Sequence, residues 1–199
     1  MAGENPIINA ILARRSISPR RLTAPGPDER QIRLMVEAAV AAPDHGRLRP
    51  WRFIFIHDED REALASAFHD AALELDPNNF GDSAKREAEK AYNAPCLIAV
   101  VGRVETAHPV IPESEQWISI GAAIQNMLLA AEDLGFSAMI VSGKKVSTSA
   151  LVRSFGLGPH ENLVGFIAIG TYAGARPSLE RAVPESVIAG WHPRIHATD

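Results

Sequence analysis

The sequence is poor in several residue types that would indicate a specialised class of protein. One cysteine in 199 residues excludes both a disulfide framework and a zinc site built from paired cysteines. Aromatic residues make up 6% of the chain, and its longest apolar stretch, interrupted by Gln125 and Asn126, is too short to predict a membrane span. The formal net charge of -4 gives no basic excess for nucleic-acid binding.

The chain also lacks the short motifs of several common enzyme classes. It has no Walker loop, no G-x-G-x-x-G following a strand, no G-x-S-x-G and no H-E-x-x-H, which argues against phosphotransferases, Rossmann enzymes, hydrolases and metalloproteases. Its histidines show no shared ligand spacing, so we expect no metal site. Cys96 lies in an apolar run and is expected to be a small buried hydrophobe rather than a reactive thiol.

The overall composition of the chain is that of an ordinary globular protein. With 46% hydrophobic residues, the chain is long enough for one domain, whose core we place at about residues 7–172, followed by a C-terminal extension at about 173–199. The N-terminus does not resemble a signal peptide, so we expect a cytoplasmic protein. Residues 1–52 hold nine arginines against five acids, a local excess that suits either a phosphate-bearing cofactor or a solvated basic surface.

Periodicity and capping signals predict helices and strands in alternation. Helices are expected at 5–14, between Asp28 and Pro43, from Asp58 as its cap to Leu75, and at 84–92, 116–134 and 148–155. Strands are expected at 51–56, 97–101, 137–142 and 163–171. The order predicts an α+β (α/β-like) domain with a central mixed β-sheet flanked by helices.

Two segments are too apolar or too irregular to be stable alone. The helix expected at 116–134 is apolar nearly all round, so we expect the core and a second subunit to bury it. The tail from Gly174 is rich in Pro, His and Arg and lacks periodic hydrophobic residues. We expect it to lie across a surface, such as that of a partner subunit.

Polar residues gather where these elements end. Arg14-Arg15-Ser16 stands where the first helix gives way to a loop, and adjacent guanidinium groups with a hydroxyl can hold a phosphate. Two arginines at a helix C-terminus also stabilise the helix dipole, so the tripeptide alone leaves both interpretations open. A second polar loop, Ala42–Trp51, joins a helix to an aromatic strand.

Together these segments resemble the nitroreductase family, in particular its small single-domain bacterial branch of the YdjA type. The resemblance rests on Arg-Arg-Ser after the first helix, Ala-Pro-Asp-His closing on Pro-Trp, and Glu115-Gln116 entering the long helix. It continues through 137–143 and 164–171 and covers about residues 7–177. The chain departs from the usual pattern at Ser18, where many relatives have a basic residue, at the inserted Pro19, and at Arg49.

The resemblance implies a nitroreductase-type fold, a homodimer whose C-terminal extension wraps the partner, and FMN sites at the subunit interface. It also implies FMN contacts, namely Arg14, Arg15, Ser16, Ile140, Val141, Ser142 and Gly143 in one subunit, with His45 reaching the flavin of the other subunit and Arg49 as a further cofactor-binding residue. Arg15 or Arg49 is the candidate for the cation near the flavin N1 and O2 edge. Among the tail arginines, Arg176, Arg181 and Arg194 remain alternatives for the phosphate.

The implied activity is hydride transfer from NAD(P)H through FMN to small electron-poor acceptors by a ping-pong mechanism. No catalytic dyad is expected, because the flavin N5 carries the hydride. Two alternatives stay open: a flavoprotein of this fold with another redox substrate, for example in a dehydrogenation, and a flavin-binding or sensing protein without turnover. We expect neither a nucleic acid nor a membrane as a partner.

Overall fold

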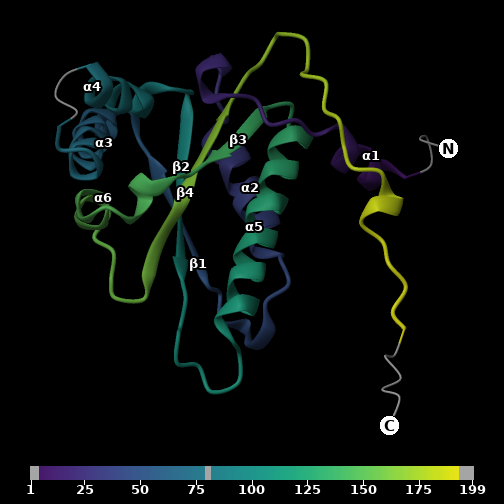
Figure 1. Ribbon diagram of the computed structural model, residues 1–199. Coiled ribbons are helices and arrows are strands. Elements are labelled where there is room, and N and C mark those ends of the chain that lie inside the picture. Colours follow the sequence, from purple (N-terminus) through teal and green to yellow (C-terminus); the bar gives the residue numbers. More distant parts are fainter. Residues whose placement is uncertain (1–4, 79–81, 193–199) are drawn as a thin grey trace.

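The structure, a computed structural model, describes residues 5–78 and 82–192. At its centre lies a four-stranded sheet in the order β1-β2-β4-β3 (Figure 1). The strands are β1 (Trp51–Ile56), β2 (Cys96–Arg103), β3 (Ser137–Val141) and β4 (Glu161–Gly170). This confirms the predicted α+β class, although all three strand pairs are antiparallel. Among the described residues, parallel pairing is limited to one bridge, Ser16 with Ala138.

Helices cover both faces of the sheet because its two central strands are apolar on both sides. Ile98 and Ile167 belong to the cluster that packs under α2 (Glu29–Val40) and α5 (Glu113–Asp133). Their neighbours Leu97 and Phe166 belong to a second cluster on the opposite face. This face is covered by α3 (Arg61–Leu75) and α6 (Ser149–Ser154), and α4 (Asp82–Glu89) packs against α3. Strand alternation thus gives the protein two cores, one on each face.

Local sequence signals predict most of these helix and strand boundaries correctly. Asp28 and Gln31 form a reciprocal capping box that starts α2, and β1 has the predicted ends. The prediction that Asp58 caps the next helix is wrong. Asp58 opens a short 3₁₀ turn, and α3 starts at Arg61 without a side-chain cap.

Cys96 is 2% exposed, and burial raises the pKa of its thiol to about 12, which confirms an inert cysteine.

The long helix α5 begins three residues before its predicted start. The amide side chain of Gln116 is buried and holds the preceding loop by bonding both the N–H and the C=O of Glu105. One side of α5 packs into the core, whereas Trp117 and Ile118 in its first turns are exposed, Ile118 by 70%. None of the described helices has the length and apolar character to cross a membrane. The apolar surface of α5 is therefore only partly covered by its own chain.

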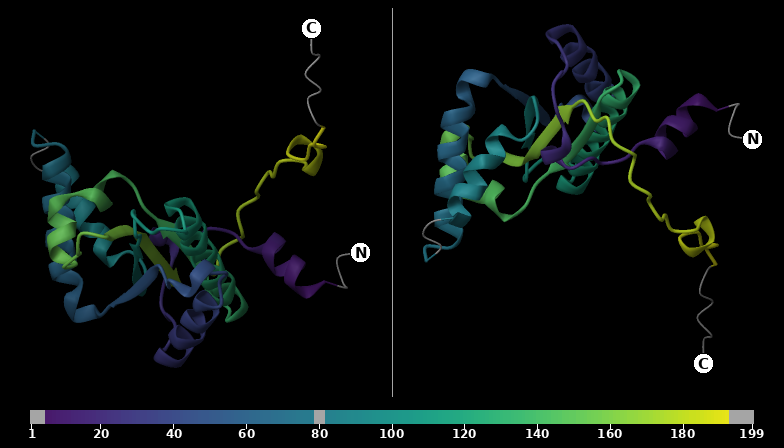
Figure 2. Two further views of the ribbon diagram at one scale, coloured as in Figure 1. Left: turned by 90° about the horizontal axis from the view of Figure 1, so that it is seen from below. Right: turned by 90° about the horizontal axis from the view of Figure 1, so that it is seen from above.

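The two ends of the described chain form an arm that projects from the body (Figure 2). It consists of α1 (Pro6–Ala13), which buries none of its residues, and the tail after Tyr172, which passes near the end of α1 and then diverges from it. The guanidinium of Arg181 donates to the carbonyl of Leu12 and joins the two segments. The arm exposes large apolar side chains, namely Ile7, Ile8, Ile11, Leu12, Leu179, Val183, Val187, Ile188 and Trp191. Apolar exposure of this extent marks an interaction surface.

A carboxylate joins three strands at the other end of the sheet. Glu161 accepts hydrogen bonds from Arg52 on β1 and from Arg103 on β2, at 2.9 Å from each. Burial alone would raise the pKa of Glu161, but these bonds outweigh it and bring the pKa to about 2. The ionised carboxylate therefore stabilises the folded sheet.

Replacing Glu161 with Gln should lower the free energy of unfolding by roughly 1–3 kcal/mol at pH 7, the scale of lost charge-assisted hydrogen bonds. Because the folded-state pKa lies below the usual value of 4.5, the wild-type advantage should be complete above about pH 4.5. It should then disappear as the pH falls toward 2. Urea unfolding of both proteins across this range measures the difference, with exposed Glu37→Gln as the control. A difference independent of pH would contradict the assignment.

Candidate functional site

The Arg14–Ser16 segment lies at the edge of the sheet, where α1 ends. Ser16 bridges to Ala138 on the edge strand β3, and the Arg14 guanidinium donates to the Ser16 hydroxyl at 3.3 Å. Arg15 instead turns back and donates to the carbonyl groups of Leu12, Ala13 and Arg14. Arg15 thus performs the helix-ending role that the sequence left open, while Arg14 and Ser16 stay together beside β3.

The second predicted segment, Ile140–Gly143, lies at the far end of the same edge strand. Gly165 on β4 permits a close approach here, because an added Cβ would stand 2.5 Å from the carbonyl oxygen of Val141. The Ser142 hydroxyl donates to the carbonyl of Val164 at 2.6 Å, and Gly143 has a φ of 137°, a conformation that favours glycine. These contacts fix the course of the chain as it leaves β3.

A cavity of about 530 Å³ lies beside the second segment. Ser18 to Arg20, which follow the first segment, form one part of its wall, and Val141 to Gly143 form another. Apolar side chains that include Phe68, Leu97 and Phe166 supply further wall. Among the described residues, the charged lining consists of four basic side chains, Arg20, Lys90, Lys144 and Lys145, and one acidic side chain, Glu87. The cavity therefore suits a partly apolar ligand with negative charge.

Sequence reasoning missed Lys145 and Glu87 as residues of this site. Helix α4 is mostly polar and partly exposed, yet the Glu87 carboxylate turns inward and binds both Lys90 and Lys145, the latter at 3.2 Å. Lys145 also lies over the Phe68 ring, 3.7 Å from its centroid. Adjacent Lys144 and Lys145 after Gly143 were a visible basic signal, but only the fold brings them to α3 and α4.

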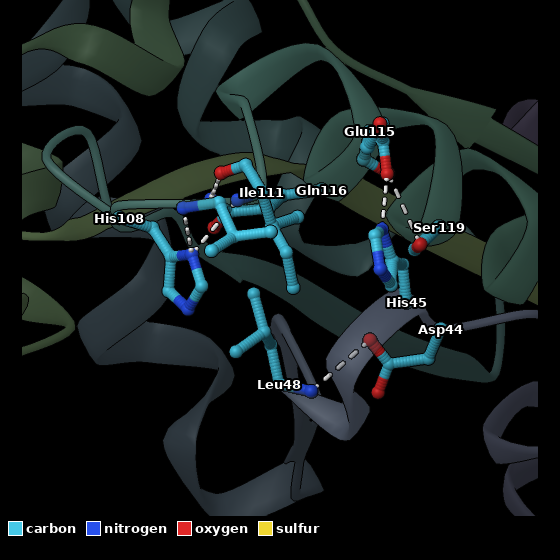
Figure 3. Close-up of polar contacts among 9 residues, drawn as sticks. Asp44, His45, Leu48, His108, Ile111, Glu115, Gln116 and Ser119 are labelled. Carbon is cyan, nitrogen blue, oxygen red and sulfur yellow. Dashed lines mark hydrogen bonds and ion pairs between the residues drawn. The ribbon is translucent and has the colours of Figure 1, made fainter.

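The third predicted group, His45 and Arg49, lies elsewhere (Figure 3). His45 Nδ1 is 2.6 Å from a carboxylate oxygen of Glu115 in the first turn of α5, and both side chains are substantially exposed. The Asp44 carboxylate accepts hydrogen bonds from the backbone N–H groups of Leu48 and Arg49. These bonds hold Arg47 and Arg49 at φ values of 55° and 51°, a strained conformation that is concentrated at functional sites.

Within one chain, the His45 group and the Arg14 group are far apart. His45 lies at the start of α5, whereas Ser16 lies beside β3, which follows the end of this helix. Because α5 has 21 residues and a helix rises 1.5 Å per residue, the two ends are about 30 Å apart. A single subunit therefore does not bring all the predicted residues to one site.

The tail arginines have partners of their own. Arg176 forms an ion pair with Glu132 near the end of α5, and Arg181 binds the carbonyl of Leu12 on α1. Arg194 lies outside the described residues. Arg176 and Arg181 therefore both stand near the Arg14 end of α5, where α1 and the tail leave the body.

Comparison with known proteins gives a consistent result. The model of the nitroreductase family matches residues 11–171. "Putative NAD(P)H nitroreductase" from Haemophilus influenzae is 36% identical over 155 residues, which cover 77% of this chain and 83% of the relative. "Putative NAD(P)H nitroreductase YdjA" from Escherichia coli is 32% identical and covers 82% and 87%.

Solved structures agree with the sequence comparison. A nitroreductase-like family protein from Bacillus cereus has a TM-score of 0.82 at 22% identity and covers 96% of this chain and 98% of its own. A nitroreductase from Desulfovibrio desulfuricans, solved in complex with FMN, has a TM-score of 0.70 at 27% identity and covers 96% and 99%. With the family model matched over most of its length, the chain belongs to the nitroreductase family.

Proposed function

We propose that this chain is an FMN-dependent oxidoreductase that uses NAD(P)H to reduce small electron-poor acceptors such as nitroaromatics or quinones. The observation that carries the proposal is the cavity between Ser18–Arg20 and Val141–Gly143, with apolar walls and an excess of basic side chains. The FMN complex of the Desulfovibrio desulfuricans relative supports the cofactor. The names of the Haemophilus influenzae and Escherichia coli relatives support the reductant.

The residues present fit FMN. Arg14 and Ser16 would hold the phosphate, because a guanidinium and a hydroxyl already lie together beside the sheet edge. Val141, Ser142 and Gly143 would line the flavin ring, chiefly with backbone groups, and Ile140 would support them from the other face of β3. Arg15, which caps α1, would contribute positive charge near the phosphate. No adenine-binding Rossmann motif accompanies these groups.

When bound, the cofactor supplies the redox chemistry, accepting the hydride of NAD(P)H and passing it, with a solvent proton, to the acceptor. The protein positions the reactants and surrounds them with apolar walls that exclude water. NAD(P)⁺ must leave before the acceptor approaches the same pocket, so the kinetics should be ping-pong. Few acid or base groups are needed for such a transfer, in keeping with the absence of a catalytic dyad in the sequence.

We further propose that the active protein is a homodimer with two sites shared between subunits. A two-fold axis that places the α5 helices antiparallel would bring His45 and Arg49 of each chain to the Val141–Gly143 segment of the other. Such a partner would also cover the apolar arm and the exposed side of α5. In this arrangement residues 7–172 are the core of a single domain, and the extension from residue 173 wraps the neighbouring subunit.

The cofactor proposal predicts that the purified protein is yellow and releases FMN, and not FAD, on denaturation. Chromatography of the released flavin against both standards measures its identity, and reconstitution of the stripped protein with each flavin gives the relative affinities. We expect one FMN per chain. Reconstitution with FAD alone, or with neither flavin, would refute the proposal.

A flavin-binding or sensing protein without turnover is the second candidate, because the binding features described above do not require catalysis. Steady-state oxidation of NAD(P)H separates the two functions, since a binding protein consumes at most one equivalent of reductant per flavin.

A further inference from the structure

Lys145 differs from the other basic residues of the cavity in the way it is held. Its side chain is 16% exposed, and its ammonium group is fixed between the Glu87 carboxylate and the Phe68 ring. Arg20 and Lys144 are exposed, where water and salt screen their charge. Lys145 therefore presents a fixed positive charge to the cavity in a partly dry setting, where electrostatic interactions are stronger.

The charge of Lys145 is incompletely balanced. Among the described residues, Glu87 is the only acidic one in the cavity lining, and Lys90 binds its other carboxylate oxygen. Burial lowers the pKa of Lys145, and the attraction of Glu87 only partly reverses this, whereas the pKa of Glu87 stays below its usual value because two lysines offset its burial. The group of three residues thus has one positive charge in excess at the cavity wall.

We propose that Lys145, positioned by Glu87, is the residue that stabilises negative charge on the reduced flavin and raises its reduction potential. The inference rests on the proposed FMN function. Reduction by a hydride adds one negative charge to the flavin, so a fixed cation in the same cavity favours the reduced over the oxidised form. Arg15, one of the two candidates from the sequence, is instead bound to carbonyl groups of α1, and Arg49, the other candidate, would reach the site only from the partner subunit.

The test compares the reduction potential of bound FMN in the wild type and in variants of Lys145 at pH 7. Lys145→Met should weaken the binding of reduced FMN about ten-fold relative to oxidised FMN, a fall of about 30 mV for a two-electron couple. Lys145→Arg should retain most of the wild-type potential, and exposed Lys85→Met on α4 controls for the loss of one surface charge.

Spectroelectrochemical titration gives the potential, and flavin fluorescence gives the affinity for the oxidised form. A purely structural role for Lys145 would weaken both redox forms equally and leave the potential unchanged, which would overturn the inference while FMN binding by the wild type stands. If Lys145→Met fails to retain flavin, Lys145→Gln decides, because it removes the same charge with a polar side chain, and an unchanged potential in that variant contradicts the inference. A wild-type chain that binds no flavin would refute the proposed function as well.

Discussion

Truncation after Thr171 is expected to convert a dimer at micromolar concentration into a monomer and to remove most of the bound FMN. The deleted tail includes five of the exposed apolar side chains of the arm, with Trp191 85% exposed. Aromatic side chains of this kind dominate interface energetics once a partner buries them. Because each proposed site takes residues from both chains, loss of the dimer should lower FMN occupancy in parallel.

Sedimentation velocity and the ratio of flavin to protein absorbance measure the two effects on the same sample. Trp191→Ser keeps the tail and should weaken the dimer by roughly 2 kcal/mol or more, about 30-fold in the dissociation constant. Val152→Ser on α6 is the matched apolar-to-polar control outside the arm, and the circular dichroism spectrum reports whether the sheet and helices remain. An active, flavin-loaded monomer would disprove the shared site but not the family assignment.

Replacing Arg14 with Ala should weaken FMN binding by roughly 1.5–3 kcal/mol, the scale of a lost charge-assisted hydrogen bond, or about 10- to 150-fold. The thermal midpoint should change little, because the only hydrogen bond that the guanidinium of Arg14 is seen to donate within the described residues goes to the exposed Ser16 hydroxyl. Fluorescence titration of the stripped protein with FMN measures the affinity.

Arg153→Ala on α6 removes the same charge far from the sheet edge and serves as the control. If Arg14→Ala folds and binds FMN as tightly as the wild type, the phosphate lies elsewhere. Arg176 and Arg181, which both lie at this end of α5, would then be the next residues to replace.

Local signals in the sequence predicted the elements because each depends on residues close in the chain. The reciprocal Asp28–Gln31 cap starts α2, and alternating bulky residues mark β1. Asp58 failed as a cap because a 3₁₀ turn intervenes before α3 begins. The resemblance to the nitroreductase family is confirmed, whereas its implied FMN contacts stay predictions.

The charged part of the cavity could not be predicted in the same way. Phe68, Glu87 and Lys145 come from α3, α4 and the turn after β3, and only tertiary packing brings them together. The sequence of α4 gives no apolar stripe that would mark a side facing the cavity. The side chain that faces inward is the carboxylate of Glu87, which pairs with lysines. The placement of the two groups of predicted residues at opposite ends of α5 likewise follows from the fold and not from their spacing in the chain.

The proposed oxidoreductase activity is tested by the steady-state rate of NAD(P)H oxidation by the FMN-loaded protein, measured over a grid of NAD(P)H and quinone concentrations. We expect many turnovers per flavin and parallel lines in double-reciprocal plots, because both substrates use one pocket in turn. Consumption of a single equivalent of NAD(P)H by a fully loaded protein would contradict this proposal and assign the chain to flavin binding without catalysis.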